Sequence, residues 1–186
     1  MSNEAKYLVF LDLETSGVDP SVHEILEFGA VITDMDLNEL ARFHRVIQPE
    51  AISWDQHMSD FVREMHTASG LLDELLDSPL TTSGVETAMC AELYRFGKPG
   101  DFVLAGSGVS HFDRRFLEAQ MPELAALFAY YSIDVGILRR TLRDIVGRED
   151  LLLPEVPKPH RALADALLHL EELRFVKGSL YVGGRQ

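Results

Sequence analysis

Residues 7–17 read Tyr-Leu-Val-Phe-Leu-Asp-Leu-Glu-Thr-Ser-Gly, an apolar, strand-prone run that carries two carboxylates and then breaks at Ser-Gly. Side chains two residues apart on a strand point to the same face. Asp12 and Glu14 are therefore expected side by side, with their backbones roughly 6 to 7 Å apart. Two like charges this close on a mostly buried strand are costly unless a cation lies between them, and Mg²⁺ or Mn²⁺ takes such oxygen ligands. The alternative is a strand end with two solvated acids.

The composition favours a soluble protein of the cytoplasm with a single domain over residues 1–186. No apolar run is long enough to cross a bilayer, and residues 1–4 lack the charge and apolar character of a signal peptide. The single cysteine, Cys90, excludes an internal disulfide framework and a cysteine-based zinc site. A net charge of −13 argues against a broad basic surface for long duplexes. It remains compatible with a short nucleic acid held beside metal ions.

Two more strands are expected soon after the first. Residues 24–34 are dense in β-branched and apolar side chains, and residues 40–48 alternate between apolar and polar side chains. The connection over 34–38 is short and polar, so these two segments read as a hairpin. We therefore expect three antiparallel neighbouring strands at the start of the chain.

The remaining chain mixes helices with short strands. Helical segments are expected in short pieces over 53–77, broken at 69–70, and then over 83–96, 111–120, from Pro122, from Asp134 to Val146, and over 161–177. Short strands are expected over 102–105 and 130–133. Ser83 and Glu86 have the spacing of a capping box at the start of the second helical segment. The order of elements favours one α/β domain with a mixed central sheet flanked by helices.

Two more acids lie at predicted helix starts. Asp113 follows a glycine-rich turn, and Asp165 lies in the first turn of the last helix with His160 five residues before it. Each has an ordinary structural explanation, because the helix macrodipole favours an Asp in a first turn. Asp165 also shares a polar stripe with His169 and Glu172, which a solvated helix face would explain equally well.

Taken together, these positions resemble the three motifs of the DEDDh 3′–5′ exonucleases. Asp-x-Glu closes the first strand, Asp113 starts a mid-chain helix, and His160 precedes Asp165 by five residues. The other branch of that superfamily has a Tyr at the position that Arg161 occupies here. Within the DEDDh branch the chain is most similar to the oligoribonucleases over nearly its whole length. Five segments carry this resemblance: residues 12–20, 66–71, 113–117, 121–122 and 133–135.

The resemblance implies an RNase H-like fold and two divalent ions, Mg²⁺ or Mn²⁺. Four carboxylates would bind the ions: Asp12, Glu14, Asp113 and Asp165. His160 would act as the general base that takes a proton from the attacking water. Two ions about 3.5 to 4 Å apart can activate a water and stabilise the leaving oxygen in an in-line displacement. A histidine that is neutral near pH 7 suits the base role.

The resemblance also assigns substrate contacts and a homodimer. Substrate-binding positions of the family fall on five residues: Thr15, Val18, Phe61, His66 and Tyr130. Val18 would wedge against a base, Phe61 would stack on one, and Tyr130 would reach in from the partner subunit. Plain core packing is the alternative for Phe61. Tyr131 stands where the family has an Arg that binds the 5′ phosphate, and Tyr cannot replace that bidentate contact, so substrate length stays open.

The sequence thus predicts a metal-dependent 3′–5′ exonuclease that hydrolyses short single-stranded oligoribonucleotides to nucleoside 5′-monophosphates. One alternative is the same chemistry on short single-stranded DNA or on 3′ overhangs. Another is a non-catalytic module that binds nucleic acid. The presence of all four carboxylates together with His160 argues against the second alternative.

Overall fold

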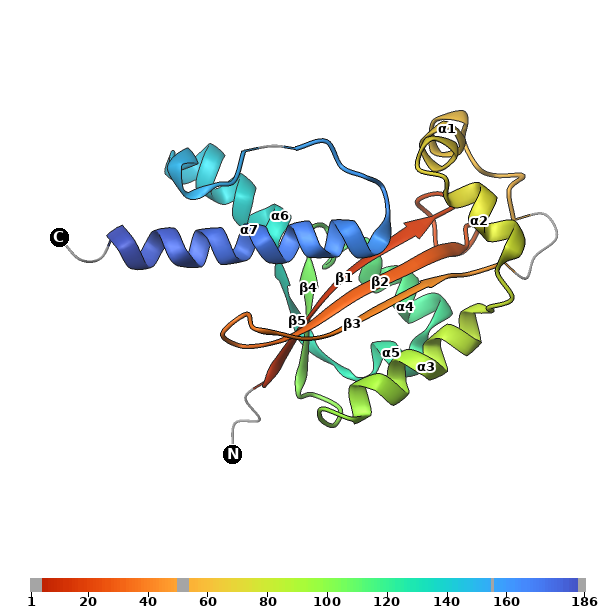
Figure 1. The fold of residues 1–186 in the computed structure, drawn as a ribbon, viewed down its shortest axis with the longest axis horizontal. Helices are drawn as coiled ribbons and strands as arrows, with labels where there is room; N and C mark the ends of the chain where they lie inside the picture. The colour runs from red at the N-terminus through yellow and green to blue at the C-terminus, as the bar shows by residue number, and fades with distance from the viewer. Residues whose placement is uncertain (1–4, 50–53, 155, 184–186) are drawn as a thin grey trace.

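The protein is described by a computed structural model that covers residues 5–49, 54–154 and 156–183. Its centre is a five-stranded sheet in the order β3-β2-β1-β4-β5 (Figure 1). The strands are β1 (Tyr7–Thr15), β2 (Ile25–Asp34), β3 (Glu39–Val46), β4 (Phe102–Gly106) and β5 (Phe128–Asp134). β1, β2 and β3 pair antiparallel, whereas β4 runs parallel to β1 and β5 parallel to β4. The predicted mixed α/β sheet and its initial hairpin are confirmed.

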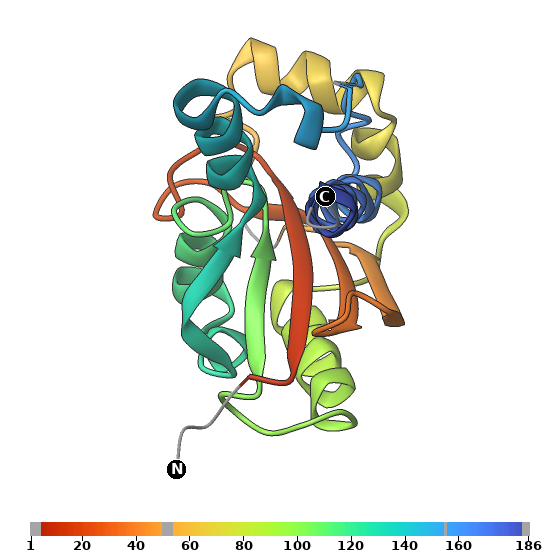
Figure 2. The ribbon, with the colours of Figure 1, turned by 90° about the vertical axis from the view of Figure 1, so that its left-hand side faces the viewer.

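Helices cover both faces of this sheet (Figures 1 and 2). The long C-terminal helix α7 crosses one face, α3, α4 and α5 pack on the other, and α1 and α2 lie beyond the end of β1. The helices are α1 (Asp60–Ala68), α2 (Leu71–Asp77), α3 (Thr82–Tyr94), α4 (Asp113–Gln120), α5 (Pro122–Ala125), α6 (Val135–Arg140), a π-helical turn η1 (Thr141–Val146), a 3₁₀ turn η2 (Glu149–Leu151) and α7 (Ala162–Gly183). Within the described residues, no helix is both long and apolar enough to span a bilayer.

Strand β1 faces two cores because its side chains alternate between the faces of the sheet. Val9 and Leu11 pack into the larger core formed with α3, α4 and α5. Leu8 and Phe10 pack into a second core together with Ala166 of α7. The positions after Phe10 on this second face are 12 and 14, so the alternation that buries Leu8 and Phe10 directs both carboxylates toward α7.

Helix α7 lies directly on the backbone of β2 at Gly29. A Cβ atom at this position would lie 2.2 Å from the backbone nitrogen of Leu163 and 2.3 Å from the carbonyl carbon of Ala162. No side chain can be accommodated there without moving the helix. The absence of a side chain at Gly29 therefore allows the first turn of α7 to approach the sheet, and it sets the height of Asp165 above β1.

The helix pair α1–α2 is anchored by a small cluster of its own. Leu71 and Leu75 of α2 pack with Leu26 of β2 and Met58. Gly70 separates the two helices in a left-handed conformation with φ of 77°, as the predicted break at residues 69–70 requires. The first residue of the predicted segment 53–77 lies outside the described residues.

The predicted capping box at the start of α3 is wrong. Thr81 is the N-cap, and its hydroxyl accepts a hydrogen bond from the backbone nitrogen of Gly84 at 3.2 Å. A capping box would need its glutamate at the position that Gly84 occupies. The carboxylate of Glu86 instead accepts hydrogen bonds from the backbone nitrogens of Glu123 and Leu124. The carboxylate of Glu86 therefore makes a tertiary contact with the start of α5 and not the local capping-box contact that the sequence predicted.

Candidate active site

Three of the predicted carboxylates meet where the end of β1 faces the first turn of α7. One oxygen each from Asp12, Glu14 and Asp165 can be chosen so that all lie within 4.8 Å of one another. Glu14 and Asp165 are buried, and Asp12 is half-buried. The prediction that Asp12 and Glu14 share a face of the strand is confirmed. The solvated polar stripe considered for α7 is not what the structure shows, because Asp165 and His169 are both buried.

The fourth carboxylate, that of Asp113, is positioned by the backbone of β1 beyond the point where β4 stops pairing with it. β4 pairs only with the first part of β1, as far as the Phe10–Ala105 pair, and ends at Gly106. The backbone N–H of Leu13 is thus free of the parallel ladder and donates to Oδ1 of Asp113 at 3.0 Å. Asp113 is the first residue of α4 and is buried. The helix begins here, two residues after its predicted start at His111.

A cleft of about 330 Å³ opens over these acids. Its lining residues come from β1, from the loop before α4 and from the segment before α7: Asp12, Leu13, Glu14, Ser107, Gly108, His111, Phe112, Asp113, Lys158, His160 and Asp165. The four carboxylates and the predicted general base therefore line one cavity. Asp113 lies outside the tight group of three oxygens but belongs to the same cleft.

The acids stand in a buried and predominantly acidic environment, with Lys158 as the basic side chain that lines the same cleft. Burial, followed by repulsion from Asp165 and Glu27, raises the pKa of Glu14 to about 8. Burial raises the pKa of Asp113 to about 7, and burial and the charge of Asp113 raise the pKa of Asp12 well above its usual range. Oδ1 of Asp165 is buried without a hydrogen-bond partner. Clustered oxygen donors with raised pKa values and an orphaned carboxylate oxygen are the donor set that a hard divalent ion prefers.

His160 lines this cleft and lies two residues before the start of α7. Its backbone is left-handed, with φ of 51°, which is uncommon for a residue other than glycine. His160 also lines a second cleft of about 430 Å³, shared with Lys158, Pro159 and residues of α1. The imidazole therefore stands where the two clefts meet.

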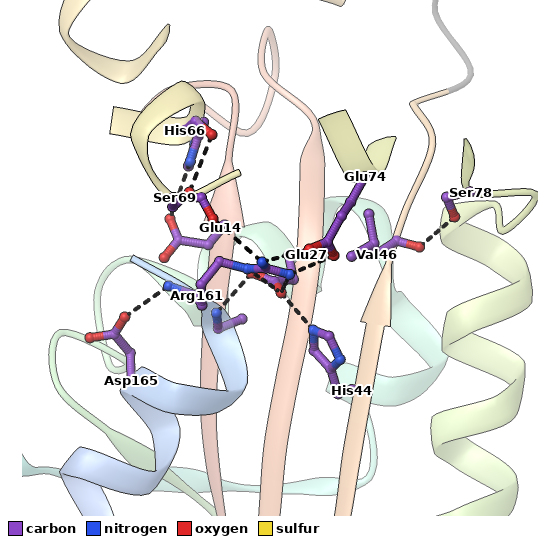
Figure 3. Close-up of polar contacts among 11 residues, drawn as sticks. Glu14, Glu27, His44, Val46, His66, Ser69, Glu74, Ser78, Arg161 and Asp165 are labelled. Carbon is purple, nitrogen blue, oxygen red and sulfur yellow. Dashed lines mark hydrogen bonds and ion pairs between the residues drawn. The ribbon is translucent and has the colours of Figure 1, made fainter. Parts of the chain in front are cut away.

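A network of polar contacts holds the start of α7 in place (Figure 3). Glu27 of β2 is fully buried, and its carboxylate accepts hydrogen bonds from Nε of Arg161 at 3.0 Å and from the backbone nitrogen of Ala162 at 2.9 Å. Nε2 of His44 contacts the same carboxylate. The backbone nitrogen of Arg161 donates to Oδ2 of Asp165 at 3.2 Å. Glu27 thus caps the helix that carries Asp165, and Arg161 links the two carboxylates.

Three of the predicted substrate-binding residues lie near the clefts: Thr15, Phe61 and His66. Phe61 lines the second cleft beside His160 and is 73% exposed, so the core-packing alternative for Phe61 is wrong. His66 is buried, and its Nε2 donates to the carbonyl of Thr15 at 2.9 Å. Nδ1 of His66 lies 3.8 Å from Oε2 of Glu14 (Figure 3). Burial lowers the pKa of His66, which keeps it neutral. His66 therefore fastens α1 to the end of β1.

The other two predicted substrate contacts lie apart from the described clefts. Val18 is 70% exposed on the turn after β1, and Tyr130 is 94% exposed on the edge strand β5. Neither residue lines the cleft of the acids or the cleft of Phe61.

Several residues of the site are absent from the sequence predictions. Lys158 and His111 line the cleft of the acids, and Glu27 supports it. A glutamate inside the otherwise apolar run of β2 was a usable signal for Glu27, because such a group is buried only with partners. For Lys158 the only signal was its place two residues before His160.

Comparisons with known proteins agree with this geometry. A family model described as exonuclease matches residues 9–173. The oligoribonuclease of Leifsonia xyli subsp. xyli is 36% identical over 184 residues, which cover 98% of this chain and 87% of that protein. The mitochondrial oligoribonuclease of Homo sapiens is 32% identical over 177 residues, which cover 95% of this chain and 74% of that protein.

Solved structures share the fold. The metal-free crystal structure of the E. coli exonuclease I complex with single-stranded DNA matches with a TM-score of 0.67 at 16% identity. The match covers 93% of this chain and 40% of the exonuclease I chain, so this chain spans less than half of that protein. The zinc-bound form of the same complex also matches with a TM-score of 0.67 at 16% identity, over 95% of this chain and 41% of that one. At this identity the likeness establishes the RNase H-like exonuclease fold.

The family model covers most of the chain, and relatives above 30% identity cover nearly all of it. The order of the motifs on β1, α4 and α7 agrees with both. The chain therefore belongs to the exonuclease family, as an enzyme of its DEDDh branch close to the oligoribonucleases.

Proposed function

We propose that this protein is a 3′–5′ exonuclease that hydrolyses short single-stranded oligoribonucleotides to nucleoside 5′-monophosphates. The observation that carries the proposal is the convergence of four carboxylates and His160 in one cleft, beside a second cleft lined by Phe61. The names of relatives such as the oligoribonuclease of Leifsonia xyli support the choice of substrate.

Asp12, Glu14, Asp113 and Asp165 would hold two divalent ions, Mg²⁺ or Mn²⁺. Bound there, such ions lower the pKa of a water and stabilise the leaving oxygen. The orphaned Oδ1 of Asp165 and the raised pKa values of its neighbours support this assignment, because a cation removes both costs.

His160 would accept the proton of the attacking water. Attack on the terminal phosphodiester forms a phosphorus–oxygen bond to that water and breaks the bond between phosphorus and the O3′ of the preceding nucleotide. The terminal nucleotide leaves as a 5′-monophosphate, and the shortened chain keeps a 3′-hydroxyl. The place of His160 at the junction of the two clefts supports this role, because a terminal nucleoside in one cleft puts its phosphate at the other.

Phe61 would stack on the terminal base, since base stacking on an aromatic tolerates every sequence. Thr15 and His66 would contact the terminal nucleoside near Glu14, and Val18 would wedge against a base. Tyr130 would complete the site from the partner subunit of a homodimer, and its exposure on an edge strand supports that assignment.

The test is a Mn²⁺-supported digestion of 5′-labelled RNA of about two to twenty nucleotides, beside DNA of matched sequence and length. Asp165→Asn is the inactive control, because it keeps the shape of the side chain and removes its charge. Fast loss of the shortest RNA supports the proposal. A preference for DNA or for 3′ overhangs would re-assign the substrate, and binding of RNA without cleavage would indicate a non-catalytic module.

A further inference from the structure

Lys158 stands where three cavities meet. It lines the 330 Å³ cleft of the four acids and the 430 Å³ cleft of Phe61. It also lines a third cavity of about 420 Å³ between α6, α7 and the loop that precedes α7. Lys158 and His160 are shared by the first two clefts and are separated in sequence only by Pro159. Pro159 has a fixed φ and restricts the backbone of Lys158, the residue before it.

The ammonium group of Lys158 has two neighbours at long range. Nζ lies 3.8 Å from Oδ1 of Asp165 and 3.5 Å from Nε2 of His169. His169 is buried, and burial followed by the charge of Lys158 lowers its pKa to about 3, so the imidazole is neutral. The side chain of Lys158 is 44% exposed. The ammonium is therefore held loosely, by one carboxylate and one neutral ring.

The charge of Lys158 is unusual for its surroundings. Among the described residues that line the two clefts, Lys158 is the only lysine or arginine. The whole chain carries a net charge of −13. A polyanionic substrate entering these clefts would therefore meet one lysine, next to the proposed general base His160.

Lys158 faces Oδ1 of Asp165, a buried carboxylate oxygen that lacks a hydrogen-bond partner. A divalent ion bound by Asp12, Glu14 and Asp165 would need this oxygen and would repel the ammonium. A lysine carries a compact charge on a flexible four-carbon stem, so it can move by several ångströms without a change of backbone.

We propose that Lys158 is a catalytic residue with two positions. In the metal-free protein its ammonium neutralises Asp165, and when a divalent ion takes Asp165 the ammonium moves to a non-bridging oxygen of the scissile phosphate. There it stabilises the negative charge that develops on that phosphate in the transition state. This inference deepens the proposed function and rests on it for the identity of the substrate.

The first test needs no substrate. Mn²⁺ is titrated into the metal-free protein by calorimetry, and wild type is compared with Lys158→Gln and with the control Lys98→Gln. Lys98 is exposed on the turn before β4, at the end of that strand away from the acids. Removing the competing cation is expected to tighten Mn²⁺ binding several-fold in Lys158→Gln and to leave Lys98→Gln unchanged. Unchanged or weaker Mn²⁺ binding in Lys158→Gln would overturn the proposal.

The second test is kinetic, at saturating Mn²⁺ on a short RNA. Lys158→Gln is expected to lower kcat roughly ten- to a hundredfold, the worth of one charged hydrogen bond, with a smaller change in KM. Lys158→Arg should restore part of kcat, because it keeps a positive donor. A change in KM alone would mean that Lys158 only attracts the substrate, and it would overturn the assignment.

The two tests separate this inference from the function on which it rests. If wild type cleaves no oligonucleotide, the proposed function fails, whereas the calorimetric result still decides whether Lys158 competes for Asp165. Far-UV circular dichroism of the metal-free variants checks that they are folded, since loss of the cation beside the buried Asp165 changes the melting temperature itself.

Discussion

Arg161 donates two hydrogen bonds to the carboxylate of Glu74, from Nη1 to Oε1 at 2.8 Å and from Nη2 to Oε2 at 2.7 Å. This bidentate pair joins the residue after His160 to helix α2 (Figure 3). Because the same guanidinium also donates to the buried Glu27, helix α2 is connected through one side chain to the sheet and to the start of α7. The helix pair that carries Phe61 is thus tied to the helix that carries Asp165.

Breaking this connection should affect substrate binding more than stability. Glu74→Gln removes the charge of a carboxylate that is half exposed, so the loss of unfolding free energy should be about 1 kcal/mol or less. KM for a short RNA should rise several-fold, because α1 and α2 are less firmly held against α7. Asp73→Asn, on the same helix, is the charge-matched control. Equal KM values for the two variants, measured from initial rates, would show that the Arg161 contact does not position Phe61.

The raised pKa values of the acids predict how stability depends on pH. The pKa of Glu14 rises from 4.5 to about 8 and that of Asp113 from 3.8 to about 7 in the folded protein. The folded protein therefore keeps protons that the unfolded chain releases, so the free energy of unfolding should fall as pH rises between about 5 and 8. Thermal melting of the metal-free protein measures this. Burial alone would raise the pKa of Glu27, but hydrogen bonds from His44 and Arg161 lower it below its usual value. Glu27 therefore affects the free energy of unfolding only at lower pH.

Divalent ions should remove this dependence, because they bind the ionised carboxylates and favour the deprotonated folded state. In saturating Mg²⁺ or Mn²⁺ the melting temperature should therefore rise most at about pH 8. Glu14→Gln should show a shallower pH dependence than wild type without metal. A melting temperature that stays level from pH 5 to 8 in the metal-free wild type would contradict the raised pKa values.

Phe61 should contribute to binding and not to folding. Its ring is 73% exposed, so Phe61→Ala should change the free energy of unfolding by no more than about 0.5 kcal/mol. Loss of a stacking partner should raise KM for short RNA roughly tenfold, and Phe61→Trp should preserve it. Leu76→Ala, at a position of α2 that is 78% exposed, is the control for loss of an exposed apolar side chain. A normal KM in Phe61→Ala would remove Phe61 from the binding site.

Two neighbouring hydroxyls at the start of α3 should differ in their effect on stability. Thr81 caps the helix, so Thr81→Ala should cost about 1 kcal/mol and lower the melting temperature by roughly 2 to 4 °C. Ser83 lies inside the first turn, and Ser83→Ala should leave the melting temperature within about 1 °C of wild type. The reverse order in thermal melting would mean that α3 begins at the position that the sequence pattern favoured.

The sequence was most informative where the physics is local. The alternation of β1 placed Asp12 and Glu14 on one face without reference to the rest of the chain. Asp113 and Asp165 could be assigned only from the resemblance to a family, since Asp113 lies 100 residues from the backbone N–H that holds it. Arg161 and Glu74, 87 residues apart, carried no local signal at all.

The errors have the same cause. Thr81 and Ser83 are both good N-cap residues, and local preference could not separate them. In the structure the carboxylate of Glu86 does not serve the start of its own helix, because it binds the backbone at the start of α5 across the core. Long-range contacts of this kind override a local motif because they satisfy buried backbone groups that no local residue can reach.

The acidic residues of the site and its two basic residues, Lys158 and His160, lie on different kinds of structural element. The acids project from β1, from the start of α4 and from α7, elements that are packed into the two cores. His160 and Lys158 belong instead to the connecting segment before α7, and Lys158 is exposed. The acids proposed to bind metal thus belong to packed elements, whereas the proposed general base belongs to a connecting segment. Substitutions in the connecting segment can therefore shift His160 and Lys158 without disturbing the two cores that fix the positions of the acids.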